Sequence, residues 1–163
     1  MVVLVAGANG QLGQAIQFIA GNYPNIHFVF CSSSELDITN KENCYSAFNK
    51  EKPDFCINAA AYTAVDKAET EPEKAKLINV FGAKNLAEAC KENNAILLHI
   101  STDFVFDGTK KEPYNEFDLP NPTGIYGNVI NSKYFFGKII PRTLSFITII
   151  EYSKIIFQRV LVG

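Results

Sequence analysis

The stretch Gly7-Ala8-Asn9-Gly10-Gln11-Leu12-Gly13 decides the fold of this 163-residue chain. It follows an apolar run at residues 2–6, which predicts a buried parallel strand. It leads into residues 12–20, whose apolar side chains share one helical face. A strand, a glycine turn and a helix in this order favour a phosphate-binding turn over a tight turn without a ligand.

Each glycine of this stretch has a distinct expected part. Gly7 permits a tight turn, Gly10 lets the backbone approach a pyrophosphate, and Gly13 lets the helix pack close to the strand. The spacing is G-x-x-G-x-x-G rather than the usual G-x-G-x-x-G, so the prediction depends on the flanking strand and helix.

The bulk composition is that of an ordinary globular domain, with 47% hydrophobic and 20% charged residues. A net charge of -2 gives no reason to expect nucleic acid or an anionic membrane as a partner. Neither a membrane span nor a basic leader is visible, so we expect a cytoplasmic protein. The four cysteines, Cys31, Cys44, Cys56 and Cys90, have neither zinc nor disulfide spacing and are expected to be buried small apolar residues. No metal site is expected.

Further strands are predicted at residues 27–31, 55–60 and 95–100, alternating with helices at 41–52 and 71–93. This alternation indicates right-handed βαβ units and an α/β fold with a Rossmann-type doubly wound parallel sheet. His99 lies inside an apolar run and is expected to be a core histidine rather than a catalytic one.

The residue that ends the second strand of a dinucleotide fold faces the adenosine ribose. Here the strand runs into Cys31-Ser32-Ser33-Ser34, and the first acids are Glu35 and Asp37. Hydroxyl groups tolerate a 2′-phosphate, but no arginine is at hand to favour it. The choice between NAD and NADP stays open at this point.

Five segments in order resemble the dTDP-4-dehydrorhamnose reductase branch of the extended short-chain dehydrogenases/reductases. They are residues 7–13, 36–39, 58–69, 101–108 and 122–127. The resemblance implies a 4-keto nucleotide sugar as substrate and NADPH or NADH as cofactor. The implied reaction is reduction of dTDP-4-dehydro-L-rhamnose to dTDP-L-rhamnose. The resemblance is also compatible with a homodimer.

The resemblance also implies roles for individual residues. The glycine turn from Gly7 to Gly13 would bind the cofactor, with Gly10, Gln11 and Leu12 on the pyrophosphate. Cofactor contacts are further implied for Asp37 and Ile38 beside the adenine and for Ala61, Tyr62 and Thr63 on the nicotinamide side. Thr102 and Asp103 would touch the substrate, Thr102 would orient its carbonyl group, and Tyr126 would donate the proton.

The chain departs from the family pattern after Tyr126. A lysine is expected four residues on, where its ammonium group would lower the pKa of the tyrosine. That position is Ile130, and the first lysine is Lys133, seven residues on. In a continuous helix Lys133 would share the face of Tyr126, but its rise would be about 10.5 Å rather than about 6 Å. A bulge in between would restore the approach, and we take Lys133 as the third catalytic residue.

We expect residues 1–138 to form the NAD(P)-binding domain. Residues 139–163 form a divergent apolar segment, either part of the same domain or irregular, with strands conceivable at 146–150 and 155–162. We recognise no family motif there, and expect both the family's next strand and its C-terminal substrate-binding domain to be missing. Besides a nucleotide-sugar reductase, the residues leave open a non-catalytic NAD(P)-binding subunit and an unstable fragment that binds nothing well.

Overall fold

The parts of the chain that this computed structural model describes are residues 1–115, 117–131, 143–151 and 154–160, the last two as backbone alone. They alternate between strands and helices, as the sequence predicts. The elements are β1 (Val2–Ala6), α1 (Gln11–Ala20), β2 (His27–Cys31), α2 (Lys41–Glu51), β3 (Phe55–Asn58), α3 (Val65–Ala68), α4 (Pro72–Lys76), the π-helix η1 (Leu77–Gly82), α5 (Ala83–Glu92), β4 (Ile96–Ser101), the 3₁₀ turn η2 (Asp103–Val105), α6 (Ile125–Asn131), β5 (Thr143–Glu151) and β6 (Lys154–Val160).

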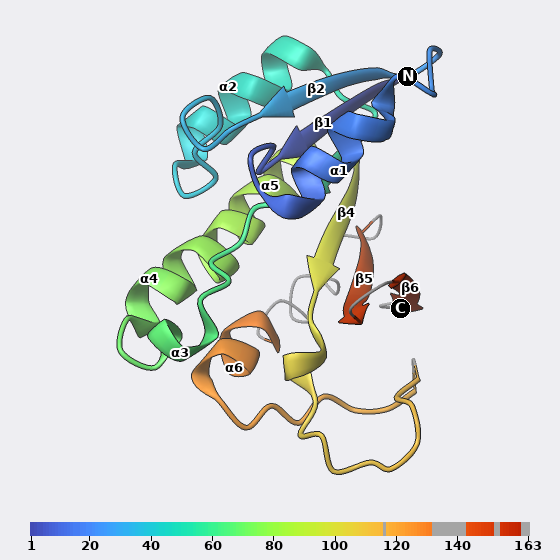
Figure 1. Ribbon diagram of the computed structural model, residues 1–163. Helices are drawn as coiled ribbons and strands as arrows, with labels where there is room; N and C mark the ends of the chain where they lie inside the picture. Colours follow the sequence, from blue (N-terminus) through green and yellow to red (C-terminus); the bar gives the residue numbers. More distant parts are fainter. Residues whose placement is uncertain (116, 132–142, 152–153, 161–163) are drawn as a thin grey trace.

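One sheet carries all of these strands, in the order β2-β1-β3-β4-β5-β6. Every neighbouring pair is parallel except β5 and β6, which are antiparallel. Figure 1 shows α1 on one face of the sheet and α2 with α5 on the other. This arrangement confirms the doubly wound Rossmann-type fold. Because β1 has β2 on one side and β3 on the other, the chain changes direction between β1 and β3, where ligands of open α/β sheets bind.

The C-terminal part of the sheet differs from expectation. β5 pairs in parallel with β4, from Leu97 beside Thr143 to Ser101 beside Ile147. The strands conceivable at 146–150 and 155–162 overlap β5 and β6, so a strand does follow β4, and the expectation that the family's next strand is missing was wrong. Isoleucine, threonine and phenylalanine dominate residues 143–150 and favour extended backbone without any family motif.

The main core lies between the sheet and the paired helices α2 and α5. Phe48 of α2, Leu86 of α5 and Leu4 of β1 are fully buried in it. All four cysteines belong to this cluster as buried free thiols, as expected. Burial raises the pKa of Cys44 to about 12, so this thiol stays protonated and acts as a small apolar side chain.

Two glycines fix how the first turn packs. Gly7 has φ +81°, and a Cβ there would lie 2.5 Å from the Ala60 nitrogen just beyond β3. A Cβ at Gly13 would lie 2.6 Å from the Ala8 carbonyl oxygen. Both contacts are with backbone, which cannot swing away as a side chain can. The tight turn expected of Gly7 and the close helix packing expected of Gly13 are therefore confirmed.

Replacing Gly13 by alanine is expected to destabilise the fold by about 1–3 kcal/mol, because the added methyl overpacks a backbone contact. The matched control is Gly21→Ala: Gly21 has helical dihedrals and nothing within 4 Å of a built Cβ. Thermal unfolding of both variants gives the comparison. Equal melting temperatures for the two variants would contradict the packing described for Gly13.

Candidate active site

The glycine turn presents an open helix N-terminus at the end of β1. The N–H groups of Gly7 and Ala8 both donate to the Cys31 carbonyl at 3.0 Å, which holds the turn against the end of β2. α1 then begins at Gln11, and its N-cap residue Gly10 provides no side-chain hydrogen bond. The first-turn N–H groups of α1 are thus placed to receive an anion.

Gly10 differs from the other two glycines of the turn. Its dihedrals, φ -75° and ψ 168°, are accessible to any residue. A Cβ there would meet nothing nearer than the Gly7 oxygen at 3.4 Å, an ordinary contact. Neither backbone conformation nor packing demands glycine at this position. A ligand that lies directly on the backbone would demand it.

Asp37 and Ile38, expected near the adenine, lie in the loop after β2. Asp37 is engaged within its own turn, accepting hydrogen bonds from the Thr39 N–H at 2.9 Å and the Thr39 hydroxyl at 2.7 Å. The Ile38 side chain is buried in the core and fills the space that a Cβ on Gly82 would occupy. The Asn85 amide donates to the Ile38 carbonyl at 2.9 Å, which ties this loop to α5.

A buried asparagine positions the segment of Ala61, Tyr62 and Thr63, expected on the nicotinamide side. The Asn79 side chain accepts from the Tyr62 N–H and donates to the Tyr62 carbonyl, each at 2.9 Å. Asn79 is only 1% exposed and lies in the π-helix η1. This asparagine was not predicted as a site residue, although a single polar side chain in an otherwise apolar turn was a visible signal.

Behind this segment, Asn58 and His99 join the ends of β3 and β4. The Asn58 side-chain oxygen accepts from the Ala60 N–H at 3.1 Å, so its amide nitrogen faces His99 Nδ1 at 3.0 Å. Both residues are buried. His99 is therefore a core histidine, as expected.

Thr102, Asp103 and Tyr126 come together beyond the carboxyl end of β4. The Thr102 hydroxyl donates to the Asp103 carboxylate at 3.1 Å and also forms a hydrogen bond with the Tyr126 hydroxyl. The Tyr126 ring is 7% exposed and packs edge-on against Phe104, with ring centroids 5.5 Å apart. Three of the predicted substrate and catalytic residues thus share one site.

Burial is the main influence on Tyr126 and raises the pKa of its hydroxyl. The hydrogen bond with Thr102 acts in the opposite direction, and the negative charge of Asp103 raises the pKa further. Tyr126 is therefore a neutral phenol at physiological pH, the protonation state of a proton donor.

Two contacts missed by the sequence analysis hold the helix of Tyr126 in place. The Glu69 carboxylate accepts from the Ile125 N–H at 2.9 Å, at the first residue of α6. A Cβ on Gly127 would clash with the Phe104 carbonyl oxygen, so α6 lies directly on the turn η2. Residues 125–131 are one continuous helix. Lys133 lies outside the described residues, so its approach to Tyr126 stays a prediction.

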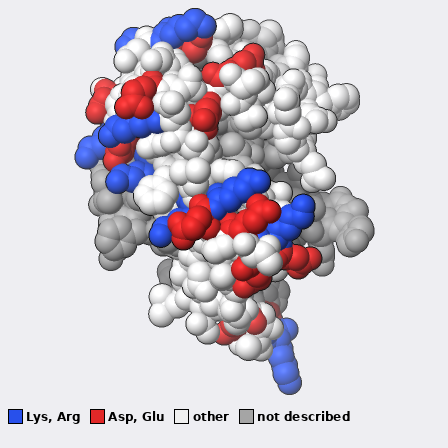
Figure 2. Space-filling model, turned by 90° about the vertical axis from the view of Figure 1, so that its left-hand side faces the viewer, with Lys and Arg blue, Asp and Glu red and all other residues white. Residues whose placement is uncertain are grey.

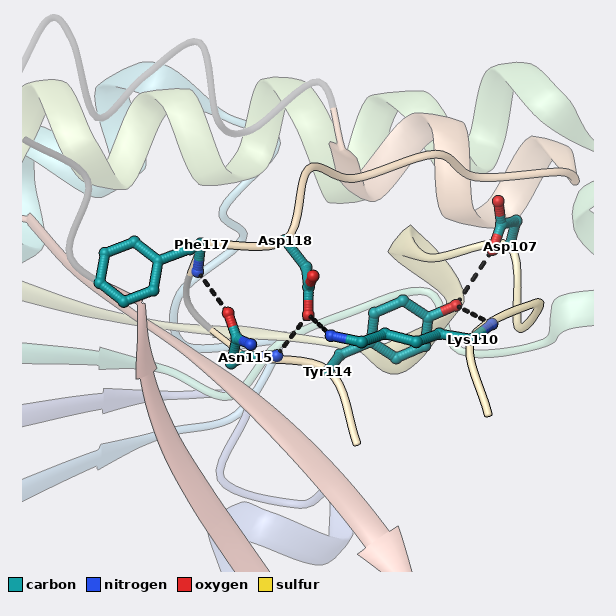
Figure 3. A network of polar contacts seen from close by, with 6 residues as sticks. All are labelled: Asp107, Lys110, Tyr114, Asn115, Phe117 and Asp118. Atoms are coloured by element: carbon teal, nitrogen blue, oxygen red, sulfur yellow. Dashed lines mark hydrogen bonds and ion pairs between the residues drawn. The ribbon is translucent and has the colours of Figure 1, made fainter. Parts of the chain in front are cut away.

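The loop between η2 and α6 is ordered by its own polar contacts (Figure 3). Asp107 accepts hydrogen bonds from Thr109, Tyr114 and Asn121, and these hold the pKa of its carboxyl well below the usual range. Lys110 and Asp118 form an ion pair with Nζ and Oδ2 2.6 Å apart. Among the described residues of this loop, these contacts connect the segment after η2 with the segment before α6.

The face of the molecule in Figure 2 carries positive and negative side chains interleaved. On α2 and α5, for example, Lys41 and Glu88 form an ion pair at 2.9 Å. Within the described residues, no cluster of three or more His, Cys, Asp or Glu is arranged to hold a metal ion. The helices among those residues are all too short or too polar to cross a membrane.

Comparison with known proteins agrees with this geometry. The family model described as RmlD substrate binding domain matches residues 1–150. A dTDP-4-dehydrorhamnose reductase of Aggregatibacter actinomycetemcomitans is 44% identical over 125 residues, covering 77% of this chain and 42% of that protein. The chain thus spans less than half the length of this relative.

Solved structures give the same result. A dTDP-4-dehydrorhamnose reductase from Clostridium acetobutylicum superposes with a TM-score of 0.86 and 41% identity, covering 91% of this chain and 53% of that one. The enzyme of that name from Bacillus anthracis, solved in complex with NADP, gives a TM-score of 0.83 and 36% identity, covering 88% of this chain and 51% of that one. By its family match, its sequence relatives and its fold, this chain belongs to the dTDP-4-dehydrorhamnose reductase family.

Proposed function

We propose that this chain is the dinucleotide-binding part of a reductase that uses NADPH or NADH to reduce the 4-keto group of dTDP-4-dehydrorhamnose. The observation that carries the proposal is the meeting of Thr102, Asp103 and Tyr126 beyond β4, on the sheet edge where the glycine turn opens. The relatives named above are reductases, so a non-catalytic subunit is not favoured.

The cofactor would lie across the switch point between β1 and β3. Its pyrophosphate would sit on the backbone of Gly10, Gln11 and Leu12, where the N-terminus of α1 favours negative charge. Its adenine would lie beside the loop of Asp37 and Ile38, and its nicotinamide beside residues 61–63, which Asn79 holds.

The remaining chemistry concerns the substrate carbonyl. Reduced nicotinamide supplies a hydride to the carbonyl carbon, and the carbonyl oxygen must then gain a proton. Tyr126, held as a neutral phenol, would donate that proton, and the Thr102 hydroxyl would hold the oxygen in place. Lys133 is the proposed cation that would stabilise the tyrosinate left behind.

The substrate would need more protein than is described here. This chain covers 42% of the Aggregatibacter relative, and a keto sugar reacts efficiently only where water is excluded. We propose that the part of the relatives not matched here supplies the wall that encloses the sugar.

Gly10→Ala tests the cofactor site. The variant should fold normally, because its Cβ has room, yet bind NADPH and NADH at least about tenfold more weakly, since the methyl would meet the pyrophosphate. Fluorescence titration of the cofactor measures the affinity, with Gly21→Ala as control. Unchanged affinity in the Gly10 variant would count against a pyrophosphate at this turn.

Tyr126→Phe tests the chemistry. Turnover of dTDP-4-dehydrorhamnose should fall by about 10²–10⁴-fold, with cofactor affinity unchanged, because only the proton donor is lost. The measurement is consumption of NADPH, and Tyr45→Phe on α2 is the matched control. Equal, measurable turnover by the Tyr126 variant and the unaltered chain would refute the catalytic proposal.

A further inference from the structure

The end of β2 carries a negative charge that the sequence analysis left without a role. The Ser32 N–H donates to Oε2 of Glu35 at 2.8 Å, and the Ser32 hydroxyl donates to the same oxygen at 2.7 Å. Glu35 therefore folds back toward Cys31, the last residue of β2. Among the described residues, the other carboxylate oxygen of Glu35, Oε1, has no hydrogen-bond partner.

This carboxylate lies close to the proposed cofactor site. The Cys31 carbonyl accepts the N–H groups of Gly7 and Ala8, so the end of β2 and the glycine turn are in direct contact. In dinucleotide folds this strand end faces the adenosine ribose. The Glu35 carboxylate, hydrogen-bonded to Ser32, therefore lies next to the strand end that would face the ribose.

Among the residues whose side chains are described, no lysine or arginine forms an ion pair with Glu35. The hydrogen bonds from Ser32 lower the pKa of Glu35, which keeps the group ionised at physiological pH. Residues 31–40 contain neither lysine nor arginine. Lys41, the next cation along the chain, is paired with Glu88 at 2.9 Å, and Lys50 with Glu51 at 2.7 Å.

We propose that Glu35 sets the cofactor preference and that this chain favours NADH over NADPH. Its carboxylate would accept a hydrogen bond from the 2′-hydroxyl of NADH and repel the 2′-phosphate of NADPH. The inference rests on the proposed function. Since a relative was solved with NADP, the family fold accepts a 2′-phosphate, and the preference is a property of the side chains at this edge.

The test is titration of NADH and NADPH against the unaltered chain and Glu35→Gln. The amide still accepts from Ser32 but carries no charge. The unaltered chain should bind NADH roughly tenfold more tightly than NADPH, and the gap should narrow at high salt. In Glu35→Gln the two cofactors should bind with similar affinity, mainly because NADPH binds more tightly. In Glu35→Lys the preference should reverse, so that NADPH binds more tightly than NADH. Glu112→Gln, in the loop before α6, makes the same change in net charge and should leave the ratio unaltered.

Three results would overturn the inference. The first is that the unaltered chain binds NADPH as tightly as NADH, or more tightly. The second is that the ratio of NADH affinity to NADPH affinity is unchanged in both Glu35 variants, while thermal unfolding confirms that the variants fold. Binding of neither dinucleotide by the unaltered chain would refute the proposed function as well. The first two results leave that function standing, so the two failures can be told apart.

Discussion

The contact between the glycine turn and the end of β3 is the constraint on which the rest of the site depends. Gly7 adopts a left-handed conformation with no room for a side chain against Ala60. The same turn takes the Cys31 carbonyl of β2 as hydrogen-bond acceptor. Three strand ends, those of β1, β2 and β3, thereby meet in one place. An anion bound at α1 consequently lies within reach of the loops after all three strands.

Outward from this contact, polar side chains between elements hold the part of the site that we propose to be catalytic. Asn58 and His99 link the ends of β3 and β4, and Asn79 fixes the backbone of Tyr62. Glu69 holds the start of α6 and so the helix that carries Tyr126. Leaving a buried polar group unpaired is costly, so the bonds of the buried Asn58, His99 and Asn79 specify one arrangement of the loops rather than merely adding stability, whereas Glu69 is exposed. The proposed hydride and proton transfers need such fixed distances.

The sequence predicted those features that short-range pattern determines. Alternating apolar strands and helices gave the doubly wound sheet, and the flanks of residues 7–13 gave the turn. It could not predict contacts whose partners lie far apart in the chain, such as Glu69 with Ile125 or Asn79 with Tyr62. The spacing of apolar residues shows which face of a helix or strand is buried, but not which other element packs against that face. A strand at 146–150 was conceivable from its β-branched residues, but its parallel pairing with β4 could not be predicted, because those residues favour a strand without specifying its neighbour.

The claim that the glycine turn is a pyrophosphate site, with Tyr126 at the reacting end, can be tested most directly by crystallising this chain with a reduced dinucleotide. The pyrophosphate oxygens should lie within hydrogen-bond distance of the Gln11 and Leu12 N–H groups, and the nicotinamide ring beside Tyr62, on the side of the Tyr126 hydroxyl. A dinucleotide bound away from the turn, or one whose nicotinamide ring is separated from Tyr126 by other side chains, would contradict that claim.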